Sequence, residues 1–200
     1  MNLKTILVAV IGLCIGGGIV YALTHGHLFD NHHNNHPIAD PYDSEYHVHA
    51  DFHIVVNDTL VDLSGDAFQT TATQELHPDL HLHDNNGDVK HIHAEDKTFA
   101  EFLASLRITL TNTCITLDTT YCADAENVFR MYVNDVVYEG DYTTYVPVDN
   151  DRILLYYGVD DSEKIATYRN AVPDESCIYS GTCPERGIAP PESCGLTCEL

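Results

Sequence analysis

The sequence predicts an α+β fold in which one main helix packs on one side of a mostly antiparallel sheet, and three observations carry this prediction. Apolar and polar residues alternate over residues 47–54, as in a half-buried strand with one apolar face and one face of histidines. Residues 98–106 place Phe and Leu side chains on one helical face. After this helix come further strand-like segments and a last apolar strand at 152–157.

The chain begins with a segment that is predicted to cross a membrane. Residues 5–24 carry no charge and follow Lys4, and a membrane-spanning helix needs about 20 mainly apolar residues. A cleaved signal peptide is the alternative, but this run is longer than a usual signal core and no clear small-residue cleavage site follows it. The positive-inside rule favours a retained anchor at residues 1–24, with Lys4 inside and the rest of the chain facing the extracytoplasmic side.

Composition divides the rest of the chain into three parts. Residues 25–45 are polar and show no hydrophobic period, so we expect a flexible linker. Residues 46–172 form the predicted extracytoplasmic α+β domain. Residues 173–200 form a Cys-rich tail that disulfides must organise. The linker also carries histidines that could capture metal loosely, at positions 25, 27, 32, 33 and 36.

Short-range signals mark the turns and the helix start within the domain. The Asn-Asp pairs at 57–58 and 134–135 are each expected to close a hairpin. Thr98 and Glu101 have the spacing of a capping box, and theirs is the one main helix that the pattern predicts in the exported part. Residues 108–117 are rich in β-branched side chains and are expected to be extended.

Residues 133–158 resemble the C-terminal part of small β-grasp, ubiquitin-like domains. In those domains a helix precedes a hairpin and a final strand that is entered through an acidic turn, here at 149–151. The resemblance implies that the α+β domain is β-grasp-like.

A hairpin at residues 81–93 carries four histidines in two H-x-H pairs around an Asn-Gly turn signal. An H-x-H pair on a strand presents both imidazoles on one face. A three-residue loop at 85–87, with Gly87 in the left-handed conformation, would pair His81 with His91 and gather all four imidazoles on one face. A two-residue loop would send the two pairs to opposite faces, so one residue of register decides between these alternatives.

The density of histidines favours a metal site. A single strand histidine is more simply explained as a solvent-facing residue or one satisfied by a hydrogen bond, but three H-x-H pairs favour a metal, because neutral imidazole is a common ligand. Met1 and Met131 are the only methionines, so Zn(II) or Cu(II) fits better than Cu(I). A site shared between the hairpin and the strand at 47–53 is favoured over a site on the hairpin alone. The predicted ligands are His81, His83, His91, His93, His47, His49 and His53. The carboxylates that could accept hydrogen bonds from them or act as additional ligands are Asp51, Asp84, Asp88 and Glu95.

The cysteines agree with export. Apart from Cys14, six cysteines remain, and an even number in an extracytoplasmic chain indicates three disulfides. Proximity suggests the pairs 114–122, 177–183 and 194–198, although spacing alone does not determine the connectivity. A thiol–disulfide oxidoreductase or isomerase is the alternative function, but such enzymes usually use C-x-x-C, which is absent. A surface interaction or scaffold module, with the tail as its contact, is a third possibility, and the sequence does not identify its protein partner.

The charge and motifs exclude some functions and leave the question of catalysis open. The formal net charge of −22 argues against nucleic acid as a partner and favours attraction of cations, although solubility or a salty medium explains it equally well. H-x-H with a third histidine resembles the zinc ligation of carbonic anhydrases and the cupin pattern, but the cupin spacing is not met. No P-loop or G-x-S-x-G motif occurs.

Four longer motifs resemble a family of membrane-anchored, exported His/Cys-rich proteins from candidate-phylum bacteria and archaea. They read HVHADFHIVVN, HLHDNNGDVKHIHAE, TLTNTC and CIYSGTCPERG, and the likeness covers nearly all of residues 46–198. The resemblance implies an exported location and the same set of histidines. Some members of that family are described as disulfide isomerases, which keeps the thiol alternative open.

Overall fold

The computed structural model describes residues 46–71 and 73–190 of the 200-residue chain. The predicted anchor at 1–24 and linker at 25–45 lie outside the described residues, as does the predicted Cys194–Cys198 pair. Within the described ranges, no helix has both the length and the apolar character needed to cross a membrane.

The histidines lie on a seven-stranded sheet built around β1 (Val48–Val56). Its other strands are β2 (Thr59–Leu60), β3 (Leu80–His81), β4 (Val89–Ile92), β8 (Asn127–Val133), β9 (Val136–Val137) and β10 (Arg152–Val159). The strand order is β3-β4-β1-β10-β8-β9, and β2 pairs separately with β1. β1 and β10 run parallel, while every other neighbouring pair in this sheet is antiparallel. The predicted α+β fold with a mostly antiparallel sheet is confirmed.

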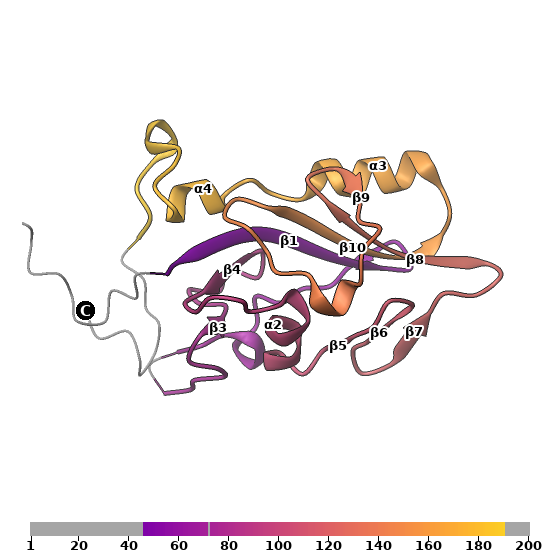
Figure 1. The fold of residues 1–200 in the computed structure, drawn as a ribbon, viewed down its shortest axis with the longest axis horizontal. Helices are drawn as coiled ribbons and strands as arrows, with labels where there is room; N and C mark the ends of the chain where they lie inside the picture. Colours follow the sequence, from indigo (N-terminus) through magenta and orange to yellow (C-terminus); the bar gives the residue numbers. More distant parts are fainter. Residues whose placement is uncertain (1–45, 72, 191–200) are drawn as a thin grey trace, which may run out of the picture. The chain divides into compact units, whose positions relative to one another are not determined.

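The helices cover both faces of this sheet (Figure 1). The predicted helix is α2 (Phe99–Ser105), and its capping box between Thr98 and Glu101 is confirmed. On this side the ring of Phe52 packs edge-on against Phe99 and Phe102, with centroids 5.8 and 5.2 Å apart. The opposite face is covered by α3 (Ser162–Ala171) and α4 (Ser176–Tyr179).

One main helix was predicted, and the structure adds α3, which the sequence pattern did not reveal. Asp161 caps its N-terminus by accepting hydrogen bonds from the backbone N–H groups of Glu163 and Lys164. Ile165 is the only residue of α3 that is buried. One buried apolar side chain leaves no helical period to detect, so the Asp161 cap was the one available signal.

The prediction that β1 is half-buried was wrong. All of its residues except Val48 are buried, including those that share a face with His49. The reason is that α3, α4 and their flanking segments pack on the polar face of β1, the face that carries His49, Asp51 and His53. Charged and polar strand residues are therefore shielded from water here by elements from the end of the chain.

The turns and two disulfides follow the prediction. Both Asn-Asp turns have positive φ at both residues, as a two-residue hairpin loop of type I′ requires. The disulfides Cys114–Cys122 and Cys177–Cys183 are present. Residues 108–117, which were expected to be extended, contain two short strands, β5 (Thr109–Leu110) and β6 (Cys114–Thr116). With β7 (Thr120–Cys122) they make a separate three-stranded sheet.

Candidate metal centre

The register of the histidine hairpin matches the arrangement that gathers the imidazoles. His81 on β3 pairs with His91 on β4, and His91 pairs with His49 on β1. These three residues form a row across three strands, so their side chains share one face. Of the two registers that the sequence left open, the structure has the one that pairs His81 with His91.

The loop of this hairpin differs in detail from the expectation. Asp84 and Asn85 adopt positive φ angles of 58° each, whereas Gly87 does not have a positive φ. Gly87 is needed for another reason: a Cβ there would lie 2.7 Å from the backbone N of Ser64 and 2.8 Å from the carbonyl C of Leu63. The hairpin loop thus packs directly against the chain that follows β2.

Six histidine side chains gather on this face, and we refer to them as the histidine cluster. Successive rings have centroids 4.2 Å (His47 and His93), 4.3 Å (His47 and His49), 4.6 Å (His49 and His91), 3.9 Å (His83 and His91) and 4.8 Å (His81 and His93) apart. The members are His47, His49, His81, His83, His91 and His93.

Three members of the cluster can hold a metal ion together. Ligand nitrogens of His47, His49 and His91 all lie within 4.8 Å of one another. His49 and His91 are buried, while His47 is exposed. His49 lies in β1, His47 directly precedes β1, and His91 lies in β4. The trio is therefore shared between two strands, as expected.

A hydrogen-bonded chain orients His91. Nδ1 of His83 lies 2.8 Å from a carboxylate oxygen of Asp84, and Nε2 of His83 lies 3.3 Å from Nδ1 of His91. A carboxylate only accepts, so His83 donates through Nδ1 and its Nε2 accepts from Nδ1–H of His91. Burial, together with the neighbouring His83 and His49, holds the pKa of His91 well below its ordinary value. His91 is therefore neutral at pH 7, with its lone pair on Nε2.

A second chain orients His49 from the other side. Nδ1 of His49 lies 2.9 Å from Oγ of Ser180, and Ser180 donates to a carboxylate oxygen of Asp149 at 2.6 Å. The same oxygen accepts the backbone N–H of His49 at 3.0 Å. Because the Ser180 hydroxyl donates to Asp149, it accepts from Nδ1–H of His49. The lone pair of neutral His49 is then on Nε2.

Tyr179 lies over the buried part of the cluster. Its ring centroid is 5.2 Å from that of His91, 5.7 Å from His49 and 6.4 Å from His83. Its hydroxyl also accepts a hydrogen bond from the side-chain amide of Asn86 in the hairpin loop. Tyr179 and Ser180 thus connect α4 with both strands that supply the buried ligands.

Two other histidines lie apart from the trio. His53 shares the face of His49 but is four residues farther along β1, roughly 13 Å away, and its Nε2 lies 3.4 Å from a carboxylate oxygen of Asp88. His77 accepts the backbone N–H of Asp79 through Nδ1 at 3.0 Å. Asp84 is an acceptor behind a histidine as predicted. Asp51 instead accepts hydrogen bonds from Ser176.

Sequence reasoning missed Asp149, Tyr179 and Ser180 as members of the site. Asp149 appeared only as a turn residue. The other two lie between Cys177 and Cys183, and no local pattern connects that segment with a strand more than 120 residues earlier. Their inclusion in the quoted motif CIYSGTCPERG was the one signal that set them apart.

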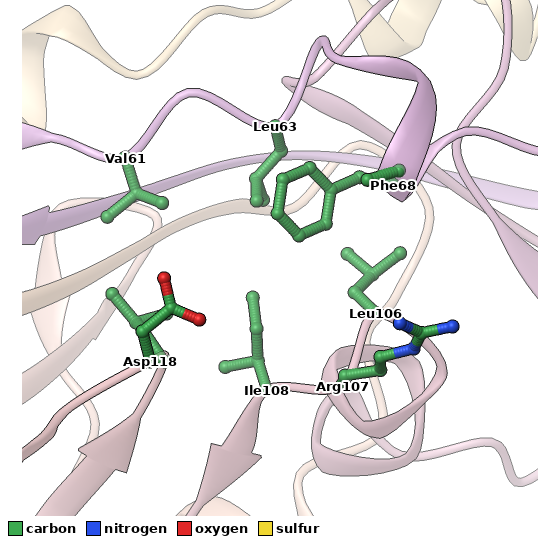
Figure 2. A pocket seen from close by; sticks show the side chains of 9 residues that line it. Val61, Leu63, Phe68, Leu106, Arg107, Ile108 and Asp118 are labelled. Atoms are coloured by element: carbon green, nitrogen blue, oxygen red, sulfur yellow. The ribbon is translucent and has the colours of Figure 1, made fainter.

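A separate pocket of about 340 Å³ lies on the α2 side of the sheet (Figure 2). Apolar side chains from the chain after β2 face Leu106 and Ile108, and Arg107 and Asp118 also line the pocket. Its lining contains no histidine or cysteine, so it is distinct from the histidine cluster. No protein-family model, curated protein or solved structure matches this chain.

Proposed function

We propose that this is a membrane-anchored extracytoplasmic protein that binds a divalent transition metal, Zn(II) or Cu(II), through His47, His49 and His91. Its use would be metal capture, delivery or structural bracing. The strongest support is the orientation of the two buried histidines, His49 and His91. In each, Nδ1 takes part in a series of hydrogen bonds that ends at a carboxylate, and the two series are separate. Metal-binding histidines in proteins are commonly held in this way, with one ring nitrogen anchored and the other directed at the ion.

The spacing of the trio is compatible with a single ion after a small adjustment. Two nitrogens bound tetrahedrally to one zinc lie roughly 3.3 Å apart, given Zn–N bonds of about 2.0 Å. The nitrogens of the trio lie within 4.8 Å of one another. Side-chain rotations, mainly of the exposed His47, would close this difference.

The other members of the cluster take supporting roles in this proposal. His83 orients His91 through their shared hydrogen bond. The ring of His93 lies beside that of His47, which makes His93 the candidate for a fourth ligand. His81 packs against His91 and His93.

We also infer a β-grasp-like domain and membership of the family of exported His/Cys-rich proteins. The first inference is supported by the order of elements, in which α2 precedes the β8–β9 hairpin and an acidic turn precedes β10. The second rests on the four sequence motifs. An anchored, exported location is consistent with the two disulfides, which form preferentially in oxidising compartments.

Zinc titration of the purified full chain against a chromophoric chelator tests the proposed function. The chain is used with the five linker histidines replaced by alanine, so that loose binding by the linker does not contribute. We expect one tightly bound zinc per chain, and binding should fall at least 100-fold in the His49→Ala/His91→Ala variant, because two of the three ligands are removed.

The matched control is His77→Ala, which removes a histidine outside the cluster. It should leave zinc affinity within about twofold of the parent chain, since surface changes away from a site have small effects. The absence of a stoichiometric zinc, or equal binding by the double variant, would exclude the proposed site.

A further inference from the structure

The disulfide Cys177–Cys183 closes a loop that carries both covering residues of the histidine cluster. Tyr179 and Ser180 lie between the two cysteines. Ser180 accepts from His49, and the Tyr179 ring lies over His49 and His91. The covalent link therefore limits the positions that these two contacts can take.

We propose that Cys177–Cys183 is a reversible thiol–disulfide exchange site whose redox state sets the metal affinity of the histidine cluster. This inference rests on the proposed metal binding. The oxidised form holds Ser180 against His49 and favours the bound ion, and the reduced form loosens this contact and favours release.

The exchange consumes two thiols, from a dithiol or from two monothiols. The first thiolate attacks the sulfur of Cys177, which is partly exposed, and Cys183 leaves as a thiolate that takes up a proton. The second thiol attacks the sulfur of the reductant in this mixed disulfide, and Cys177 is released. The protein disulfide gains two electrons and two protons, and the two reductant thiols become a disulfide.

A cationic side chain lies at the sulfur that is released in the second step. Nη1 of Arg186 is 3.4 Å from Sγ of Cys177, and the same nitrogen donates to the backbone carbonyl of Asp174 at 2.7 Å. A positive charge beside a cysteine favours its thiolate form. Arg186 would therefore assist the departure of Cys177.

The start of α4 is held independently of the disulfide, which keeps the effect of reduction local. Asp51 on β1 accepts the backbone N–H of Glu175 at 2.9 Å and the hydroxyl of Ser176 at 2.5 Å. Opening the disulfide leaves these contacts intact. The freedom gained is then concentrated in residues 178–183, which include Tyr179 and Ser180.

The chain contains its own control in the disulfide Cys114–Cys122. It joins facing residues of β6 and β7 in the separate three-stranded sheet. Both cysteines lie outside the sheet whose strands carry His49 and His91. A redox effect on metal binding that acts through Tyr179 and Ser180 should involve Cys177–Cys183 and leave Cys114–Cys122 unaffected.

Thermodynamic linkage provides a test in the unaltered full chain. If oxidation favours zinc binding, zinc must favour oxidation by the same factor. The chain is equilibrated in glutathione redox buffers with and without saturating zinc. Free thiols are then alkylated and quantified for each cysteine by peptide mass spectrometry. We expect zinc to lower the reduced-to-oxidised ratio of Cys177–Cys183 about tenfold or more, the scale on which contacts behind metal ligands act, and to leave the Cys114–Cys122 ratio unchanged.

Zinc titration of two double variants provides the second arm. Cys177→Ser/Cys183→Ser should bind zinc about tenfold or more weakly than the parent chain, whereas Cys114→Ser/Cys122→Ser should bind within about twofold. Circular dichroism shows whether each variant is folded, and if the first is not, the linkage measurement alone decides.

The possible failures can be distinguished. A parent chain that binds no zinc removes the proposed function and this inference together. A parent chain that binds zinc while the Cys177–Cys183 ratio does not respond, or responds equally with Cys114–Cys122, removes only the redox control.

Discussion

Nε2 of His83 lies 3.3 Å from Nδ1 of His91, and this contact joins the two arms of the histidine hairpin to one carboxylate, that of Asp84. His83 comes just after β3 and His91 lies within β4. The contact forms because His81 and His91 are in register, which places His83 on the same face as His91. Metal affinity should therefore depend on residues that do not themselves contact the ion.

Asp84→Ala should weaken zinc binding roughly 10–100-fold, the usual effect of removing an acceptor behind a metal-binding histidine. Without the carboxylate, His83 is no longer held with Nε2 as the acceptor for His91. The change is measured by competition with a chromophoric chelator. Asp88→Ala is the matched control, because Asp88 faces His53 and not the trio. Equal losses of zinc affinity in the two variants would mean that any nearby negative charge has this effect. The hydrogen bonds from Asp84 through His83 to His91 would then not be responsible.

Gly87→Ala should destabilise the protein by about 1–3 kcal/mol, because the added Cβ would collide with backbone atoms of Leu63 and Ser64 that cannot easily move. Urea unfolding followed by circular dichroism measures this free energy. Gly65→Ala is a suitable comparison, since nothing lies within 4 Å of its added Cβ, and it should change stability by less than about 0.5 kcal/mol. Similar values for the two variants would contradict the close approach of the loop.

Lys90→Met should stabilise the protein by about 1–3 kcal/mol at pH 7. Lys90 is fully buried at 0 % exposure, and its Nζ makes no hydrogen bond to any described residue. It lies 5.6 Å from the ring centroid of Phe99. A methionine would occupy similar space without burying an amine that has no hydrogen-bond partner in this part of the chain.

The same lysine predicts how stability depends on pH. Burial lowers the pKa of Lys90 from 10.5 to about 7, an effect that nearby Asp151 and Asp51 partly oppose. Between pH 7 and 10.5 the unfolded chain thus binds more protons at this residue than the folded chain, so the lysine contributes a rise in stability with increasing pH. Lys90→Met lacks this contribution, and its advantage over the parent should shrink from pH 7 to pH 10 in urea unfolding. A constant advantage would show that the amine is protonated in the folded state throughout.

Asp51→Ala should loosen α4 and weaken zinc binding together. Removal of the carboxylate leaves the backbone N–H groups of Glu175 and Ser176 without their acceptor. Hydrogen exchange of residues 176–180 should accelerate at least tenfold, since one lost charge-assisted hydrogen bond is worth about 1.5–3 kcal/mol. Asp62→Ala, which removes a local contact with Ser64, is the control. Unchanged hydrogen exchange in Asp51→Ala would mean that other contacts hold residues 176–180 in place.

Local patterns were sufficient to predict β1, α2 and both Asn-Asp turns. Alternation marks a strand, a capping box marks the start of a helix, and Asn and Asp tolerate the positive φ that the turns require. The hairpin register was narrowed to two alternatives. The observed register is accompanied by close packing of Gly87 against Leu63 and Ser64, a long-range contact that turn chemistry does not specify.

The packing of α3 and α4 over the face of the histidine cluster could not be predicted, for a physical reason. α3 buries one apolar residue, Ile165, and the buried residue of α4 is Ser176; α4 is held by hydrogen bonds to Asp51 and by a disulfide. Such contacts leave no period in the sequence. The sequence therefore predicted seven histidine ligands, whereas the nitrogens of only three of the described ones, His47, His49 and His91, form a group that could hold a metal ion. It did not predict the supporting roles of Ser180 and Asp149.

X-ray absorption at the zinc edge tests the central claim most directly. The sample is the full chain with alanine at the five linker histidines, loaded with one equivalent of zinc. We predict a first shell of nitrogen and oxygen at about 2.0 Å, with the outer-shell scattering of three imidazoles or, if His93 binds, four. In the His49→Ala/His91→Ala variant, two imidazoles should be lost from this shell. Zinc surrounded mainly by carboxylates or sulfur, or an imidazole signal unchanged in the double variant, would contradict the proposed centre.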